Sequence, residues 1–209
     1  MSRPKPSLAR IGLTVMALLA IPLALLAYTY LFGHVPPHVV AGNPFWPRLL
    51  PAHASLGATA LLLGFLQFIP RLRNGYPAVH RWTGRTYATC CLLGGTAGLI
   101  LAFGAPTGAV TTFGFGSLAL LWLGTTVTGW RMAWLDRTAE HRRWMIRSFA
   151  MTFAFVTFRA ELQLGVVLGL PFETSYQISA VLCSVTNLLV AELIIRRGPA
   201  RPRCRAAPA

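Results

Sequence analysis

The sequence is short of acidic residues: only 5 of its 209 residues are Asp or Glu, against 19 Lys and Arg. Charged residues make up 11% of the chain, whereas a soluble domain carries about a quarter. Apolar residues make up 55%, which excludes an ordinary soluble domain. The formal charge of +14 comes from short basic clusters between long apolar runs. Because no continuous basic face results, nucleic acid is excluded as the expected partner.

The sequence also lacks the usual motifs of metal and nucleotide chemistry. Its four cysteines form no CxxC or CxxCH pattern, so neither a zinc knuckle nor a covalent c-type haem is indicated. No glycine-rich nucleotide loop, HExxH or GxSxG occurs. These absences leave no reaction indicated by a local motif.

Long apolar runs are abundant instead. A helix needs about 20 apolar residues to cross the bilayer core. Six segments meet this length: Ile11–Phe32, Leu49–Ile69, Trp82–Phe103, Thr111–Trp130, Trp144–Leu170 and Ser175–Ile195. The first has a basic leader, but its apolar run is too long for a signal peptide and no cleavage site follows. The sequence therefore predicts an all-α, polytopic bundle of six transmembrane helices.

The basic residues predict the orientation of this bundle. Seventeen of the 19 lie in the segments that share one side with the N-terminus, and only Arg48 lies in an opposite loop. Because positive loops stay in the cytoplasm, both termini are expected there. All but one of the basic residues are Arg, which is typical of a GC-rich bacterial genome and favours the bacterial inner membrane. We expect one domain over residues 1–197 and a disordered basic tail over residues 198–209, attracted to the lipid bilayer.

Small and polar residues form stripes at helical spacing along the predicted helices. Small residues let neighbouring helices approach closely, so the stripes predict the packing seam of the bundle. The stripe of the second segment is His53, Gly57, Ala60, Gly64, Gln67 and Arg71. The third segment has His80, Gly84, Tyr87, Cys91, Gly94 and Gly98, and the fifth has His141, Met145, Ser148, Thr152, Phe155 and Arg159. The fourth segment offers Gly114, Ser117, Gly124 and Thr128.

Ionisable side chains inside a membrane are costly and indicate function by default. Helix direction places His53 and Arg159 near the outer surface. Glu161 lies two residues beyond Arg159 and points to another face, so each needs a partner elsewhere. We predict an outer polar cluster of His53, Arg159, Glu161 and Gln163. The alternative is a buried ion pair that fixes the register of the helices.

The inner side has a different pattern. His80-Arg81-Trp82 with Arg85 resembles His141-Arg142-Arg143-Trp144 with Arg147, and both stretches begin an outward-going helix. This similarity indicates an internal duplication in which the second and third helices correspond to the fourth and fifth. It places two histidines at one depth, as the axial ligands of a b-type haem iron require. The arginines that would pair with the propionates are Arg81, Arg85, Arg142 and Arg147. The alternative is that these are ordinary interfacial residues, with Glu192 neutralising one arginine.

The chain resembles a bacterial family of predicted membrane proteins, DUF2306. The resemblance rests on His53-x3-Gly57 with Gly64-x2-Gln67, on His80-Arg81-x2-Gly84-Arg85-x-Tyr87, and on His141-x2-Trp144-Met145-x-Arg147-Ser148 running to Thr157-x-Arg159. It covers most of the chain from the second helix onward. The resemblance implies a multi-pass membrane protein and no established reaction. More loosely, the chain looks like a cytochrome b561-type bundle, which carries two pairs of transmembrane histidines; here His53 is the single outer one.

Three functions are compatible with these patterns. The leading hypothesis is a redox-associated membrane protein that binds haem b, or a quinone, with His80 and His141 as ligands. The second is a small transporter or proton-coupled carrier that uses the outer His/Arg/Glu cluster. The third is a structural subunit whose charges serve topology and helix register. Because the loops are short, any partner subunit would bind within the membrane.

Overall fold

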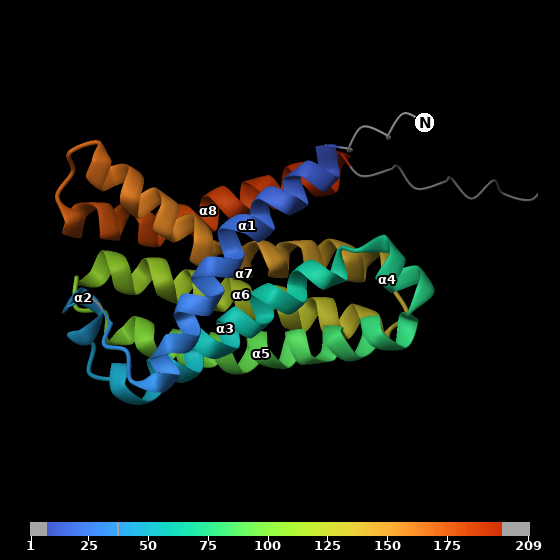
Figure 1. Cartoon of the computed structure of the whole chain (residues 1–209), viewed down its shortest axis with the longest axis horizontal. Helices are drawn as coiled ribbons and strands as arrows, with labels where there is room; N and C mark the ends of the chain where they lie inside the picture. Colours follow the sequence, from blue (N-terminus) through green and yellow to red (C-terminus); the bar gives the residue numbers. More distant parts are fainter. Residues whose placement is uncertain (1–7, 37, 198–209) are drawn as a thin grey trace, which may run out of the picture.

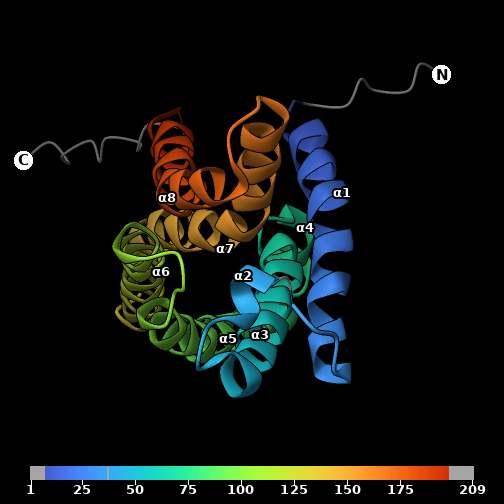
Figure 2. The same cartoon turned by 90° about the vertical axis from the view of Figure 1, so that its left-hand side faces the viewer.

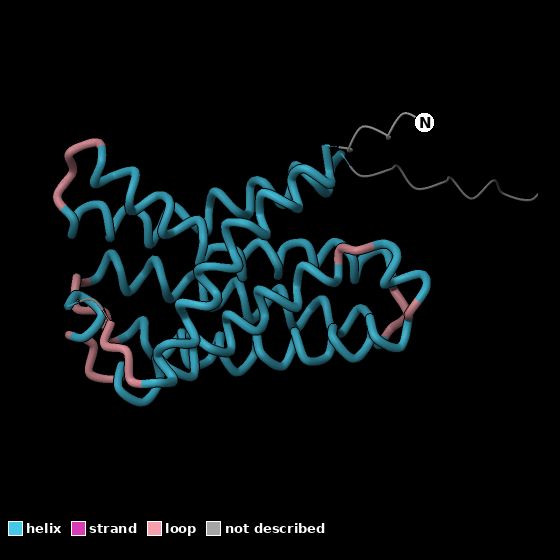
Figure 3. The backbone as a smooth tube through the Cα atoms, viewed as in Figure 1, coloured by secondary structure: helices cyan, strands magenta, loops and turns pink. Residues whose placement is uncertain are grey.

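The computed structural model describes residues 8–36 and 38–197, and the predicted tail over residues 198–209 lies outside them. The described part consists of helices joined by short loops, with no strand (Figures 1 and 3). Its elements are α1 (Leu8–Tyr28), η1 (Thr29–Phe32), α2 (His38–Ala41), α3 (Trp46–Gln67), α4 (Pro70–Gly75), α5 (Pro77–Phe103), α6 (Ala109–Trp134), α7 (Thr138–Val167) and α8 (Phe172–Arg197).

The six predicted transmembrane segments are confirmed. Within the described residues, six helical stretches are long and apolar enough to cross a membrane: the stretch Thr14–Phe32 and the helices α3, α5, α6, α7 and α8. Proline at the first turn of α3, α4 and α5 removes an N–H that would have no helical partner. Gly33 ends η1 in the left-handed region, with φ of 81°. The two short helices α2 and α4 were not predicted, because each has fewer than two turns and lies between the long apolar segments.

Four helices form the core of the bundle, and two lie outside it. Figure 2 shows α3, α5, α6 and α7 arranged around a common axis, with α5 and α7 diagonally opposite. Along this ring α3 packs on α5, α5 on α6 and α6 on α7. Helix α1 crosses the outer face of α3 (Figure 1), and α8 covers α7 and α6. We call the end that carries α4 the basic end, and the end that carries α2 the opposite end.

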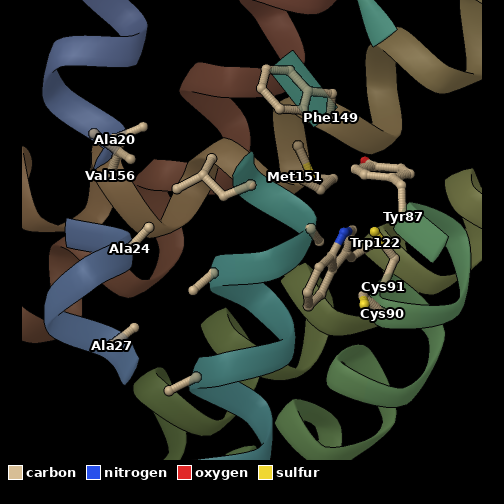
Figure 4. Packing of buried hydrophobic residues seen from close by; sticks show 14 of the residues in the cluster. Ala20, Ala24, Ala27, Tyr87, Cys90, Cys91, Trp122, Phe149, Met151 and Val156 are labelled. Atoms are coloured by element: carbon tan, nitrogen blue, oxygen red, sulfur yellow. The ribbon is translucent and has the colours of Figure 1, made fainter. Parts of the chain in front are cut away.

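Glycines in the core make room for large side chains from neighbouring helices. A Cβ at Gly64 would lie 2.4 Å from the ring of Phe149, and one at Gly94 would lie 3.5 Å from the indole of Trp122. Figure 4 shows Trp122 and Tyr87 among the buried residues of this cluster. The predicted packing role of the stripes on α3 and α5 is therefore confirmed.

The stripe predicted on α6 was wrong in part. Gly114 is buried against α8, but a Cβ at Gly124 would meet nothing within 4 Å, and Gly124 is exposed. The buried face of α6 instead carries Trp122 and Thr126. The physical reason is that a small residue is tolerated on a lipid-facing surface as well as at a helix contact, so its spacing alone does not fix the face.

A constant register relates α5 to α7 across the core. The Tyr87 hydroxyl lies 2.9 Å from Ser148 Oγ, and Cys91 Sγ lies 3.9 Å from Thr152 Oγ1. In both pairs the residue numbers differ by 61. The two helices run in the same direction, so residues that differ by about 61 lie at similar levels in the middle of the core. Extended to the ends of the helices, the same offset would match His80 with His141 at the basic end, and Gly98 with Arg159 at the opposite end.

Candidate functional site

His80 and His141 lie at one level at the basic end of the core. Each is seven residues, or about 10 Å of helix rise, before the hydrogen-bonded pair Tyr87 and Ser148. The two imidazoles are close enough for their charges to interact. Both histidines that the sequence singled out therefore lie at the basic end of the core.

The two rings differ in how their nitrogens are used. His141 Nδ1 lies 2.8 Å from the carbonyl oxygen of Gly129 on α6. In this geometry Nδ1–H donates to the carbonyl, and Nε2 keeps its lone pair. His80 Nδ1 is buried and has no hydrogen-bond partner among the described residues. A buried ring nitrogen without a protein partner is rare in folded proteins, so this atom is available to a ligand.

The four arginines predicted around the histidines differ in their exposure and in the groups that they contact. Arg81 and Arg142 are exposed, and Arg85 lies over the ring of Trp82, 5.1 Å from its centroid. Arg147 is half-buried and forms a two-pronged ion pair with Glu192 on α8, at 2.5 and 3.1 Å. The proposed neutralisation of an arginine by Glu192 is confirmed.

One arginine near the histidines was missed. Arg73 on α4 is close enough to His80 for their charges to interact, as is Arg81. Arg73 was hard to identify from the sequence, because it lies between two apolar segments, where the apolar pattern does not predict a helix. It is a second candidate, besides Arg81, to hold an anionic group beside His80.

Loss of the Arg147 pair is expected to weaken the contact between α7 and α8. Replacing Arg147 with alanine leaves the carboxylate of Glu192 without its partner, and we expect a loss of about 1–2 kcal/mol in unfolding free energy. The measurement is unfolding of the detergent-solubilised protein followed by circular dichroism. Arg137→Ala is the control, because its 3.8 Å pair with Glu140 is on the surface; an equal loss there would contradict the assignment.

A connected set of hydroxyl groups fills the middle of the core. The Tyr87 hydroxyl reaches Ser148 and Thr152 on α7, at 2.9 and 3.0 Å. Thr126 Oγ1 lies 2.7 Å from Ser148 Oγ, and the indole N–H of Trp122 donates to Thr152 Oγ1 at 2.9 Å. These bonds join α5, α6 and α7 where no water competes. These hydrogen bonds hold α5, α6 and α7 in fixed positions relative to one another in the middle of the core.

The opposite end of the core holds His53 and Arg159. His53 Nδ1 lies 2.8 Å from the carbonyl oxygen of Gly94, and its ring lies against Gly98, where a Cβ would be 2.7 Å from Cε1. Arg159 is at the level of Gly98 and within electrostatic range of His53. These two members of the predicted outer cluster are therefore together.

The other two members of that cluster lie elsewhere. Glu161 faces α8, where its Oε1 accepts a hydrogen bond of 3.0 Å from Thr186. Gln163 is exposed. The reason for the division is helix geometry: a step of two residues turns the side chain of Glu161 about 200° from that of Arg159.

A family model described as a predicted membrane protein, DUF2306, matches residues 50–195. The chain belongs to this family. The match runs from α3 into α8 and includes both histidines of the basic end, together with His53 and Arg159. No curated protein and no solved structure matches the chain.

Membership in DUF2306 establishes a membrane protein and assigns no reaction. Within the matched region, the basic end offers two imidazoles with nearby positive charge. Such a set is suited to binding a metal centre that carries negative groups. The opposite end offers hydrogen-bond donors and a positive charge, which is suited to binding an anion.

Proposed function

We propose that this membrane protein binds one b-type haem at the basic end of its core, with His80 and His141 as axial ligands, and that it serves as a one-electron carrier. The observation that carries the proposal is the common register of the two histidines. They lie toward the same end of diagonally opposite helices, each seven residues before the hydrogen-bonded pair Tyr87 and Ser148, and this position suits two axial ligands on either side of an iron.

The donor set supports an iron porphyrin better than a bare metal ion. Within the described part of the chain, no group of three or more His, Cys, Asp or Glu side chains is placed to hold a metal ion. Two imidazoles are too few for a site made of protein ligands alone. A porphyrin supplies four nitrogens itself and needs only the two axial positions filled. The unpartnered Nδ1 of His80 and the bond from His141 to Gly129 fit this role.

The residues around the two histidines would hold and orient the group. Arg73 and Arg81 would pair with the carboxylates of the propionates. One turn further into the core, the space beside Gly84 and Gly129 is filled by the ends of Gln67 and Met145. Met145 is a flexible side chain that changes rotamer at small cost, whereas movement of Gln67 would break the 2.7 Å hydrogen bond that its Nε2 donates to Thr83 Oγ1. The bound group would supply one-electron oxidation and reduction, and the protein would supply its position in the membrane.

We also propose that the protein lies in the inner membrane of a bacterium with both termini in the cytoplasm. The support is the distribution of its basic residues, of which 17 belong to one side. The basic end would then face the cytoplasm, so electrons would enter or leave on that side.

The absorption spectrum of the detergent-purified protein tests the haem proposal. After expression with ample haem, we expect a Soret band in the unaltered protein. His80→Ala and His141→Ala should each lose most of it, because either change removes an axial ligand. His38→Ala is the matched control, since His38 is exposed on α2 at the opposite end, and it should keep the band.

Size-exclusion chromatography separates loss of the ligand from loss of the fold. A histidine variant that elutes as the unaltered protein and lacks the band supports the assignment. Free imidazole should restore the band in His141→Gly, because it replaces the missing side chain. The absence of a Soret band in the unaltered protein, or an unchanged band in both histidine variants, would rule the proposal out.

A further inference from the structure

Arg159 carries a charge inside the membrane without an acidic partner among the described residues. The two ion pairs of the described chain are Arg137 with Glu140 and Arg147 with Glu192. Arg159 instead donates from Nη1 to the carbonyl oxygen of Phe155 at 3.2 Å, and its guanidinium lies 3.9 Å from the centroid of the Phe155 ring. A guanidinium has five N–H donors. An unpaired charge inside a membrane is costly, so this guanidinium favours an anionic partner.

Three further polar side chains lie around Arg159, each from a different element. Tyr30 on η1, His53 on α3 and Tyr176 on α8 are all within electrostatic range of its guanidinium. Ring contacts fix Tyr176 beside α7, since its centroid lies 5.2 Å from that of Phe158. His53 is fixed by its bond to Gly94 and its contact with Gly98, which is level with Arg159.

This cluster has donors in excess of acceptors. Neither the Tyr30 nor the Tyr176 hydroxyl forms a hydrogen bond with any residue that the structure describes, and most N–H groups of Arg159 are likewise unused. The nearest acid along the chain, Glu161, faces α8 and accepts from Thr186. The chain thus places a positive charge and two free hydroxyl donors together and directs its own carboxylate away from them.

We propose that Arg159, Tyr30 and Tyr176 bind an anionic oxygen ligand, a phosphate group, at the opposite end of the core. The planar fork of a guanidinium matches two oxygens of a phosphate, and the tyrosine hydroxyls donate to the remainder. Arg159 lies eight residues, about 12 Å, before the end of α7, so the site is reached from the opposite end of the bundle. The phosphate therefore comes from a lipid headgroup or from free phosphate in the surrounding water.

Thermal unfolding of the delipidated protein in a neutral detergent tests this site and distinguishes the two sources. One arm adds short-chain phosphatidylglycerol, one adds inorganic phosphate, and one adds sodium chloride at matched ionic strength. We expect the first or second to raise the midpoint by several degrees above the salt arm. A rise with phosphatidylglycerol alone identifies a lipid headgroup, and a rise with inorganic phosphate identifies the free ion.

The variants decide whether Arg159 carries the binding. Arg159→Gln should lose the rise, whereas Arg48→Gln should keep it, because Arg48 is exposed near the same end of the bundle. The double change Tyr30→Phe with Tyr176→Phe keeps the charge and removes two donors, so it should weaken the apparent affinity by about tenfold even if Arg159→Gln does not fold. No rise in the unaltered protein, or an equal rise in the double variant, would overturn the proposal. The result does not depend on haem, since the measurement needs no Soret band.

Discussion

Replacing Gly114 with valine is expected to lower the free energy of unfolding by about 2–3 kcal/mol. A Cβ at this position would lie 2.7 Å from both the carbonyl carbon and oxygen of Ala180 on α8. Backbone atoms do not move aside as a side-chain end does, so the two helices would have to separate. Separation exposes the contact between α6 and α8 along its length. Unfolding in detergent, followed by circular dichroism, measures the loss.

Gly116 provides the control on the same helix. A Cβ at Gly116 would meet nothing within 4 Å, so Gly116→Val should leave the unfolding free energy nearly unchanged. The two changes add the same atoms to the same helix two residues apart. If both variants lost the same stability, the effect would come from helix propensity, and the close approach of α6 to α8 would be contradicted.

Replacing Trp122 with alanine is expected to cost about 3–5 kcal/mol. The indole is 7% exposed, fills the space left by Gly94 and Gly95 on α5, and donates to Thr152 on α7. Its removal leaves a cavity in the centre of the core and an unused hydroxyl acceptor. The edge of its ring also meets His53, with centroids 6.4 Å apart. The variant should therefore loosen the opposite end of the core as well.

Trp134→Ala is the matched change, because Trp134 lies on the same helix and is 79% exposed. It should change the stability by only a few tenths of a kcal/mol. Unfolding of both variants under identical conditions makes the comparison. A small loss at Trp122, equal to that at Trp134, would mean that the core is not closed around the indole.

The six transmembrane helices of this chain were predictable from its sequence because a bilayer imposes a minimum helix length. The stripes on α3, α5 and α7 were predictable for a related reason. Helices that approach closely in a membrane need small residues at their contact, and the spacing of Gly57, Gly64, Gly94 and Gly98 meets that need. The constant offset between α5 and α7 follows from two stripes with the same spacing.

The partners of individual side chains were less predictable. Trp122 lies at mid-span, where an aromatic side chain packs equally well against lipid or against glycines, and only the arrangement of three helices decides between them. The position of the tyrosines near Arg159 was equally hard to predict. Tyr30 and Tyr176 lie at helix ends, where tyrosine is common at any membrane surface. For Glu161, the sequence indicated a face different from that of Arg159, but not which helix that face would meet.

The electron paramagnetic resonance spectrum of the ferric, haem-loaded protein tests most directly whether His80 and His141 form one site. Two imidazoles on one iron give a low-spin signal. We predict this signal in the unaltered protein and in His38→Ala, and its replacement by a high-spin signal, or its complete loss, in His80→Ala and in His141→Ala. A low-spin signal that persists unchanged in either of these two variants would show that the two histidines do not share an iron.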